Sequence, residues 1–249
     1  MTLSLKDMYL IKAGELFLKG KNHKFFEKTL IQEIKTKTNC KNLINLHNQY
    51  LIDEGENLNK VFGISNYSKV IECNFDKIKE EALKLVEENK SLSILCKRST
   101  KNYKPSPEIE RETAEFILKQ KPLKINLTNP EQIIYITLIN GKAYVYKNKI
   151  KGLGGLPIGS EAEVLIKVKN EKLSTVTGFL ILKRGCKISL TKELPLLKPY
   201  YNYKIKENSD VIATDETIET LKFKTKNKLI LRPLIGLSKE EINNIYSNL

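Results

Sequence analysis

Residues 164–185 constrain the fold of this chain more than any other segment. They contain, in order, an apolar stretch typical of a strand, a short polar loop, and an apolar stretch typical of a helix that ends at Gly185. Nucleotide-binding units have this order, and glycines in their loop let the backbone close around a phosphate at the helix start. The loop of this chain, residues 169–174, has no glycine and carries a carboxylate at Glu171. The segment therefore predicts the outline of such a unit without its phosphate loop.

Composition favours a folded protein with a polyanionic partner. The 249 residues are 41% hydrophobic, which is enough for packed cores in one large domain or in two to three small ones. The chain has 43 Lys and Arg against 29 Asp and Glu, a formal net charge of +14. Such an excess is typical of proteins that bind nucleic acid. The alternative is a Lys- and Asn-rich composition that only solvates the surface.

The cysteines and the apolar runs argue against several other classes. The four cysteines lie far apart and form no CxxC pair, so we expect reduced, buried thiols rather than a metal cluster or disulfides. They are Cys40, Cys73, Cys96 and Cys186. For Cys186, which has basic neighbours, a lowered pKa is the alternative. The first residues lack a signal peptide's apolar core, and no apolar run approaches the ~20 residues that span a bilayer. We expect a cytoplasmic protein with no membrane partner and no metal.

Strand-like and helix-like segments alternate over the first part of the chain. An amphipathic helix follows Asn22, which is a suitable N-cap, and another helix starts at Ser106 with Pro107 at its first helical position. Asn140-Gly141 separates two strand-like runs and predicts a two-residue hairpin turn. The expected strands cover residues 9–12, 43–52, 70–75, 92–96, 133–138 and 143–146, and the expected helices residues 22–34, 58–64, 76–88 and 106–119.

The last part of the chain also alternates strands and helices, which favours a parallel sheet. A capping box at Ser238 and Glu241 opens its last helix. The glycine-rich residues 152–159 precede a strand, whereas a dinucleotide-binding fingerprint follows one, so a linker is their favoured role. The expected strands cover residues 164–168, 187–190, 211–213 and 229–231, and the expected helices residues 174–182 and 238–247.

Residues 96–111 are the strongest candidate for a contact with nucleic acid. Their basic side chains follow a buried strand and precede a helix start, where phosphates bind readily, and Tyr103 is placed to stack on a base. A solvated basic loop is the alternative. A weaker group, Lys12, Lys19, Lys21 and Lys24, is assigned to the solvated surface on composition. His23 and His47 have no metal or nucleophile partner in the sequence, so we assign no catalytic residue.

Four segments, collinear over nearly the whole chain, resemble the tRNA 4-thiouridine synthase (tRNA sulfurtransferase) family. Residues 14–30 are similar to the family's opening GExxLKGKNRxxFExxL, and residues 231–242 to its RPLIGxDKxEI. Residues 97–109 resemble its THUMP signature, and residues 152–159 the junction into its last domain. The resemblance implies an α/β fold with an α+β N-terminal part. It consists of a ferredoxin-like domain (1–64), a THUMP RNA-binding domain (65–160) and a shortened, Rossmann-like PP-loop ATP pyrophosphatase domain with a parallel sheet (161–249).

The resemblance also indicates what the loop has lost. The family's PP-loop, SGGxDSPVA, aligns without a gap to the residues from Lys169 onward. Lys169, Asn170 and Glu171 replace the serine and both glycines. Leu173 replaces the aspartate, and Ser174 alone is retained. Side chains in place of the glycines obstruct close approach of a pyrophosphate, and Glu171 repels it.

Two further departures point the same way. The segment between Leu190 and Val211 is shorter than in the family, and Thr214 alone remains of a nucleotide-contacting TGxxxGQVASQT motif. The chain also ends without the later cysteine that carries sulfur in some members. We therefore expect that ATP binding is lost, that the PP-loop is degenerate and that no cofactor is bound.

These expectations combine into one hypothesis and two alternatives. The hypothesis is a tRNA-binding protein that is catalytically inactive on its own and serves tRNA thiolation as a carrier or specificity subunit. The first alternative is a functional sulfurtransferase completed by a partner, and the second is an interaction module without RNA binding. An active PP-loop or sulfur-carrier enzyme and a second copy of the chain are the candidate protein partners. By analogy with the family, the expected RNA-binding residues are Lys19, Lys21, Asn22, Lys97, Arg98, Lys101, Lys104 and Arg111.

Overall fold

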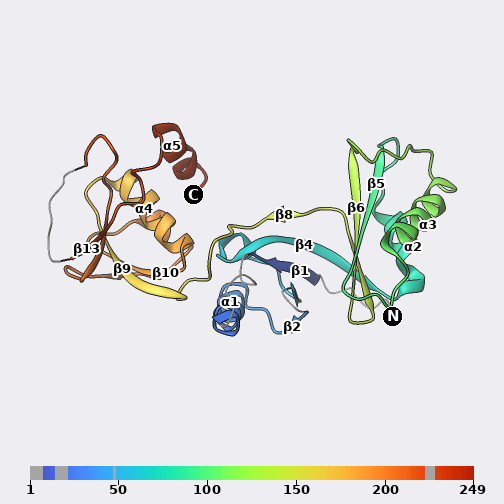
Figure 1. Cartoon of the computed structure of the whole chain (residues 1–249), viewed down its shortest axis with the longest axis horizontal. Coiled ribbons are helices and arrows are strands. Elements are labelled where there is room, and N and C mark those ends of the chain that lie inside the picture. The colour runs from blue at the N-terminus through green and yellow to red at the C-terminus, as the bar shows by residue number, and fades with distance from the viewer. Residues whose placement is uncertain (1–7, 15–21, 47–48, 222–227) are drawn as a thin grey trace. The chain divides into compact units, whose positions relative to one another are not determined.

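Alternating hydrophobic patterns build two sheets with helices packed on them (Figure 1). The computed structural model describes residues 8–14, 22–46, 49–221 and 228–249. The chain divides into two compact units. The first unit comprises residues 1–13, 38–56 and 66–151, and the second comprises residues 14–37, 57–65 and 152–249. The expected α/β class, with a ferredoxin-like and a THUMP-like part, is confirmed.

The first unit contains a sheet with the strand order β2-β3-β1-β4-β7-β6-β5. Strand β1 (Met8–Ala13) pairs antiparallel with β3 (Gln49–Ile52), which also pairs with β2 (Leu43–Asn45). The prediction of one strand over residues 43–52 was wrong, because the chain turns back there and forms two antiparallel strands. Strand β4 (Ile64–Cys73) also pairs with the short β8 (Ile150–Lys151).

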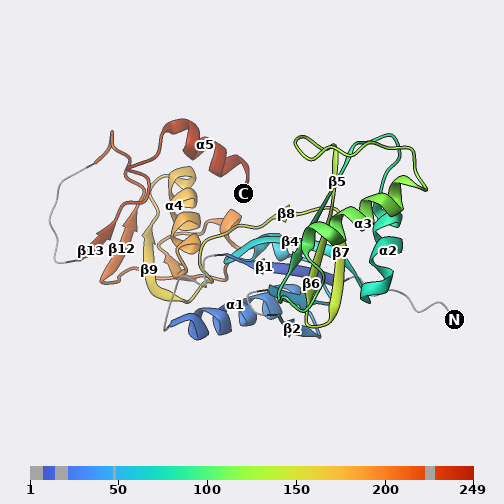
Figure 2. The same cartoon turned by 45° about the vertical axis from the view of Figure 1, so that its right-hand side comes forward.

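The other half of this sheet carries two helices, α2 (Ile78–Leu85) and α3 (Ser106–Leu118), which contact each other (Figure 2). Strand β5 (Leu92–Arg98) is parallel to β6 (Gln132–Ile139), and β6 is antiparallel to β7 (Lys142–Tyr146). Buried aliphatic side chains of both helices and of these strands form one core.

In this half of the sheet, one predicted turn is confirmed, and the bounds of two predicted helices differ from the structure. Asn140 and Gly141 both have positive φ, 49° and 80°, which confirms the predicted hairpin turn. The helix expected over residues 76–88 is shorter, because residues 75–77 form a 3-10 turn and α2 ends at Leu85. Pro105, and not Ser106, is the N-cap of α3.

The second unit contains an all-parallel sheet with the order β11-β10-β9-β12-β13, as predicted. Three consecutive residues of its central strand, Val164, Leu165 and Ile166, are buried, which is typical of a strand covered on both faces. The strands are β9 (Glu161–Lys167), β10 (Cys186–Leu190), β11 (Lys204–Ile205), β12 (Val211–Thr214) and β13 (Leu229–Leu231). The helices are α4 (Glu171–Lys183), α5 (Lys239–Ser247) and the 3-10 turns η2 (Leu58–Lys60) and η4 (Pro195–Leu197).

Helix α1 (His23–Thr38) is tied to the second unit by two polar side chains. The carboxylate of Glu33 accepts a hydrogen bond from the Ile158 amide at 2.9 Å. The ammonium group of Lys37 donates to the carbonyls of Pro199 and Tyr200, each at 2.8 Å. Burial raises the pKa of Glu33 to about 7, although the Ile158 amide and the charge of Lys37 act in the opposite direction.

The glycine-rich residues 152–159 are hydrogen-bonded on both sides. The Gly63 amide donates to the Gly154 carbonyl, and the Gly154 amide donates to the Ile64 carbonyl, each at 2.8 Å. Further along, the Leu156 amide donates to the Lys183 carbonyl at 3.0 Å. The segment expected to be a linker is therefore a fixed part of the second unit, which we name the glycine bridge.

Glu33 gives the stability of the protein a specific dependence on pH. A carboxyl group whose pKa rises on folding stabilises the folded state fully below its usual pKa of 4.5, and this contribution is lost as the pH passes about 7. We expect the free energy of unfolding of Glu33→Gln, relative to wild type, to increase by about 3 kcal/mol between pH 4 and pH 8. Urea denaturation of both proteins at several pH values measures this difference. A constant difference would show that Glu33 ionises as easily in the folded protein as in water.

Candidate nucleic-acid interface

Strand pairing in the first unit brings distant lysines to one polar hollow. Lys12 on β1 lies opposite Gln49 on β3, and Lys97 on β5 lies opposite Thr137 on β6, so each pair shares a face of the sheet. All four residues line a hollow of about 80 Å³, together with Lys149, which follows β7. The remaining lining residues are Leu10, Asn66, Ser68 and Tyr146. We name this site the lysine hollow.

The electrostatics of the lysine hollow favour an anion. No carboxylate is among the described residues that line it. The pKa of Lys149 is lowered by burial and then by the positive charges of Lys97 and Lys12. The Lys149 ammonium also lies 3.4 Å from the centre of the Tyr135 ring, a cation–π contact that holds it in place. Three mutually repelling ammonium groups beside hydroxyl and amide side chains form a suitable site for a phosphate.

The residues predicted from the segment 96–111 fall into two groups. Lys97 lines the lysine hollow, and Lys101 is exposed nearby in the sequence. Arg98 is half-buried, and its guanidinium donates to the Tyr103 carbonyl at 2.7 Å, which gives it a role in holding the loop. Tyr103 stacks on Phe75, with ring centroids 6.4 Å apart, and its hydroxyl accepts the Gly141 amide at 2.7 Å. The Tyr103 ring is thus packed into the loop, and not presented to a base as expected.

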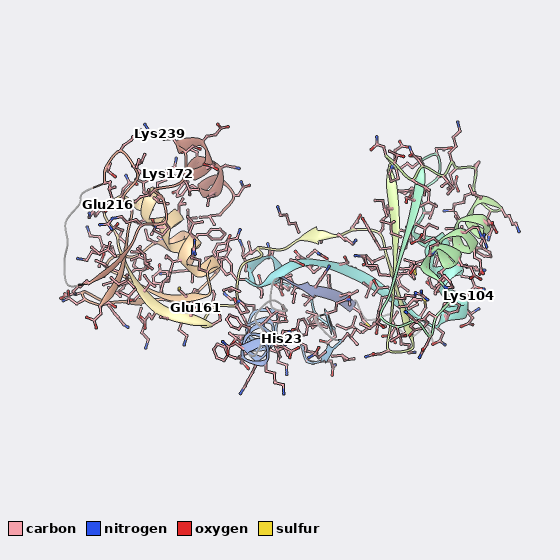
Figure 3. The ribbon with its side chains drawn as sticks, in the orientation of Figure 1. His23, Lys104, Glu161, Lys172, Glu216 and Lys239 are labelled. Carbon is pink, nitrogen blue, oxygen red and sulfur yellow. The ribbon has the colours of Figure 1, made fainter. Side chains whose placement is uncertain are left out.

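Ion pairs reduce the free charge of the other predicted residues. Lys104, which is labelled in Figure 3, contacts the carboxylates of Glu108 at 3.3 Å and Glu112 at 2.5 Å. Arg111 lies 4.0 Å from Glu115, and both side chains are well exposed.

The remaining predicted residues lie near the start of α1. Asn22 is exposed and directly precedes the helix. Lys19 and Lys21 lie outside the described residues, so their roles stay predictions. Lys12 had been assigned to the solvated surface, and Lys149 was not singled out. The three-dimensional structure is needed to show that Lys12 and Lys149 line the same hollow as Lys97.

The loop before α4 in the second unit is filled by its own contacts. Asn170 caps the helix, and its side-chain oxygen accepts the Leu173 amide at 3.0 Å. Ser174 is buried, and its hydroxyl accepts the Lys169 amide at 3.3 Å. These contacts use the backbone amides of Lys169 and Leu173, at positions where a phosphate loop would offer its amides to the ligand.

A carboxylate from a neighbouring strand completes this arrangement. Strands β9 and β12 are parallel neighbours, so Asp215, which follows β12, lies beside the loop that follows β9. The Asp215 carboxylate accepts the Asn170 amide at 2.8 Å and the Ser174 hydroxyl at 2.9 Å. Asp215 is 5% exposed. The carboxylate of Asp215 therefore accepts hydrogen bonds from the loop at two residues, Asn170 and Ser174, and holds the loop in this conformation.

The pocket beside this loop is lined by charged side chains of both signs. It measures about 400 Å³, and both Asp215 and Glu216 line it, together with Lys169 and Leu173. Glu216 contacts Arg232 at 2.8 Å (Figure 3). Glu171, which the sequence suggested as the repelling carboxylate, is exposed and does not line the pocket. Of the two carboxylates that line the pocket, Glu216 is paired with Arg232, whereas Asp215 accepts hydrogen bonds from the loop itself.

Burial disfavours the thiolate form of two of the cysteines. Burial raises the pKa of Cys96 to about 11 and is also the main cause that raises the pKa of Cys186. The lowered pKa considered for Cys186 was wrong, because burial and the nearby Glu161 carboxylate outweigh the effect of Arg184. Within the described ranges, no group of three His, Cys, Asp or Glu side chains could hold a metal ion. No described helix is long and apolar enough to cross a membrane.

Family models match the first part of the chain. Residues 8–68 match the ThiI ferredoxin-like domain, and residues 72–148 match the THUMP domain. The protein is therefore a THUMP-domain protein with a ferredoxin-like domain before it. Together with the relatives described next, these matches show that the chain belongs to the tRNA sulfurtransferase (4-thiouridine synthase) family, as the resemblance had indicated.

Two bacterial relatives illustrate the similarity. A probable tRNA sulfurtransferase of Mycoplasmopsis synoviae is 36% identical over 186 residues, which cover 72% of this chain and 50% of the relative. One of Acetivibrio thermocellus is 31% identical over 235 residues, which cover 84% and 60%. The chain thus spans about half the length of the curated relatives it matches.

Two solved structures share the fold. The protein PH1313 of Pyrococcus horikoshii superimposes with a TM-score of 0.83 at 25% identity, over 97% of this chain and 99% of that protein. A 4-thiouridine synthetase, solved as an RNA complex with bound ATP, gives a TM-score of 0.80 at 22% identity, over 97% of this chain and 84% of that protein. The second similarity concerns the fold alone.

Proposed function

We propose that this chain binds tRNA through the lysine hollow and does not use ATP on its own. The convergence of Lys12, Lys97 and Lys149 on a polar hollow, whose described lining residues include no carboxylate, carries the first part. The names of the relatives, tRNA sulfurtransferases, support tRNA as the nucleic acid. A protein that contacts mainly phosphates recognises RNA by its shape, and such binding is strongly dependent on salt.

The loop before α4 supports the second part of the proposal. A nucleotide phosphate would have to displace the Asp215 carboxylate from the Asn170 amide and the Ser174 hydroxyl, and would meet Glu216 in the same pocket. Displacing the buried Asp215 carboxylate raises the free-energy cost of phosphate binding, because the carboxylate would lose both hydrogen bonds and lie beside a like charge. These contacts favour an ATP site that has been lost over the alternative of a sulfurtransferase that a partner completes.

In this proposal the chain acts in the cytoplasm as a tRNA carrier or specificity subunit for a separate modifying enzyme. The candidate enzymes are an active PP-loop protein and a sulfur carrier. The chain spans about half the length of its relatives, so a role in tRNA thiolation is part of this proposal.

Neutralising the lysine hollow tests the proposal directly. We expect the double variant Lys97→Ala, Lys149→Ala to weaken tRNA binding and to lower the slope of log K against log salt by about two, one for each lysine that no longer meets a phosphate. Filter binding of bulk tRNA at several salt concentrations measures both quantities. The weakening should be uniform across tRNA species, because phosphates carry no sequence information.

The double variant Lys84→Ala, Lys104→Ala is the matched control, because it removes the same two charges from lysines already paired with carboxylates, Lys84 with Glu81 and Lys104 with Glu108 and Glu112. The control should keep the wild-type slope. An equal loss of affinity in the control and in the Lys97→Ala, Lys149→Ala variant would mean that net charge, and not the hollow, determines binding. ATP–pyrophosphate exchange by the purified chain would contradict the second part of the proposal and leave the first part intact.

A further inference from the structure

The lysine hollow carries more positive charge than one backbone phosphate needs. Lys12, Lys97 and Lys149 all line it, and no carboxylate is among its described lining residues. Burial, followed by the positive charges of Lys97 and Lys12, lowers the pKa of Lys149, so both of the other ammonium groups repel that of Lys149. A phosphate within an RNA strand has one negative charge. An anion with two negative charges would relieve this repulsion more completely.

The hollow has room for one small group. Its volume of about 80 Å³ corresponds to roughly two to three water molecules, since a water occupies about 30 Å³ in the liquid. A tetrahedral phosphate group is of this size, whereas a sugar or a base is larger. A phosphate within a strand has a nucleoside on two sides. A terminal phosphate has a single ester arm and three free oxygens, so it can enter a small hollow further.

Polar side chains of the sheet line the hollow between the lysines. Ser68 on β4 and Thr137 on β6 are buried and contribute hydroxyl groups, and Gln49 on β3 adds a side-chain amide. Thr137 also shares a hydrogen bond of 3.3 Å with the Tyr146 hydroxyl of β7. Hydroxyl and amide groups donate to phosphate oxygens, and strands hold such groups more precisely than loops. The hollow is therefore a formed site with several donors, and not an open basic surface.

Lys149 is held at the hollow by a stack of aromatic rings. Its ammonium group lies 3.4 Å from the centre of the Tyr135 ring. Tyr135 in turn stacks on Tyr146, with ring centroids 5.3 Å apart, and Tyr146 is a buried lining residue. A lysine side chain that is already placed loses less conformational entropy when an anion binds.

We propose that the lysine hollow selects a phosphate monoester over a phosphodiester, and that in an RNA strand this monoester is the 5′-terminal phosphate. A phosphate monoester carries about 1.5 to 2 negative charges at pH 7. Its three free oxygens accept from the ammonium, hydroxyl and amide donors together, and bonds between charged groups are the stronger ones. The RNA source rests on the proposed function, because it requires that the chain binds RNA at this hollow.

Three RNA hairpins of one sequence test this selectivity with the wild-type protein. The first has a 5′-phosphate, the second has a 5′-hydroxyl, and the third has a 5′-hydroxyl and one extra nucleotide at that end. The extra nucleotide places a phosphodiester where the first hairpin has its monoester. Fluorescence anisotropy with a label at the 3′ end should show about ten-fold tighter binding of the phosphorylated hairpin than of either other hairpin, because one hydrogen bond between charged groups is at stake.

Two double variants assign the preference to the hollow. Lys97→Ala, Lys149→Ala should bind the three hairpins equally, because the monoester no longer meets these two ammonium groups. Lys84→Ala, Lys104→Ala removes two lysines that carboxylates already pair, and it should keep the ten-fold preference. An unchanged preference in the first variant would overturn the assignment to the hollow.

The comparison of hairpins also separates this inference from the proposed function. Equal binding of the phosphorylated and the extended hairpin would overturn this inference and leave RNA binding intact. Absence of binding by all three hairpins would contradict the proposed function and the RNA source together. Titration calorimetry with ribose 5-phosphate distinguishes a free sugar phosphate from an RNA end. Ribose 5-phosphate should bind more weakly than the phosphorylated hairpin, and tighter binding would overturn the RNA source.

Discussion

Gly155→Ala is expected to lower the free energy of unfolding of the second unit by about 4 kcal/mol. An added Cβ at Gly155 would lie 2.1 Å from the carbonyl oxygen of Lys183, a backbone atom that cannot rotate away. The residue also has φ of +72°, a conformation that costs an L-residue about 1–2 kcal/mol. Overpacking adds about 1–3 kcal/mol. Urea or thermal denaturation followed by circular dichroism measures the decrease.

Gly154→Ala is the matched control for this prediction. Gly154 has a similar φ of +64°, but an added Cβ would meet no atom within 4 Å. We expect this variant to be destabilised only by the backbone conformation, by about 1 kcal/mol. Similar destabilisation of both variants would mean that the glycine bridge does not pack closely against the end of α4.

The close approach of Gly155 to Lys183 shows that the glycine bridge packs against the end of α4. The Lys183 carbonyl that Gly155 approaches also accepts the Leu156 amide at 3.0 Å, so the bridge binds the last turn of α4. Three residues later, the Ile158 amide binds Glu33 of α1. The glycine-rich sequence therefore permits close contact with both helices, and this contact positions the chain just before β9.

Local patterns in the sequence predicted most elements of the fold. The turn at Asn140-Gly141 follows from residues that accept positive φ, and the capping box of Ser238 and Glu241 is present as expected. The run of apolar residues in β9 predicted a strand, and the alternation of strands and helices predicted the parallel sheet to which it belongs. These features depend on neighbours in the sequence, so no tertiary information is needed to find them.

The candidate sites depended on contacts between residues that are distant in the chain. Lys12, Lys97 and Lys149 come together only because β1 and β5 belong to one sheet in the first unit. Lys104 and Lys97 are equivalent in the sequence pattern, but Lys104 pairs with carboxylates on α3, whereas Lys97 lines the lysine hollow. Burial raises the pKa of Glu33, and a local sequence pattern does not reveal how deeply a side chain is buried. The family resemblance draws attention to the loop of residues 169–174, but it does not predict that Asp215 forms hydrogen bonds with this loop.

Asp215 illustrates this limit and gives the second large effect. We expect Asp215→Ala to lower the free energy of unfolding of the second unit by about 4 kcal/mol. The variant leaves the Asn170 amide and the buried Ser174 hydroxyl without their shared acceptor, and each hydrogen bond to a charged group contributes about 1.5–3 kcal/mol. Chemical denaturation monitored by circular dichroism measures the change.

Two further variants separate the acceptor role of Asp215 from its charge. Asp215→Asn keeps one side-chain oxygen that can accept both donors, so it should be destabilised by about 1–2 kcal/mol, less than the alanine variant. Asp210→Ala removes an exposed carboxylate of the same unit and should change the stability by less than about 0.5 kcal/mol. If Asp215→Ala were as stable as Asp210→Ala, the carboxylate would not organise the loop. The loop of residues 169–174, which has no glycine, would then be held in place by its other contacts, such as the Asn170 cap on the Leu173 amide.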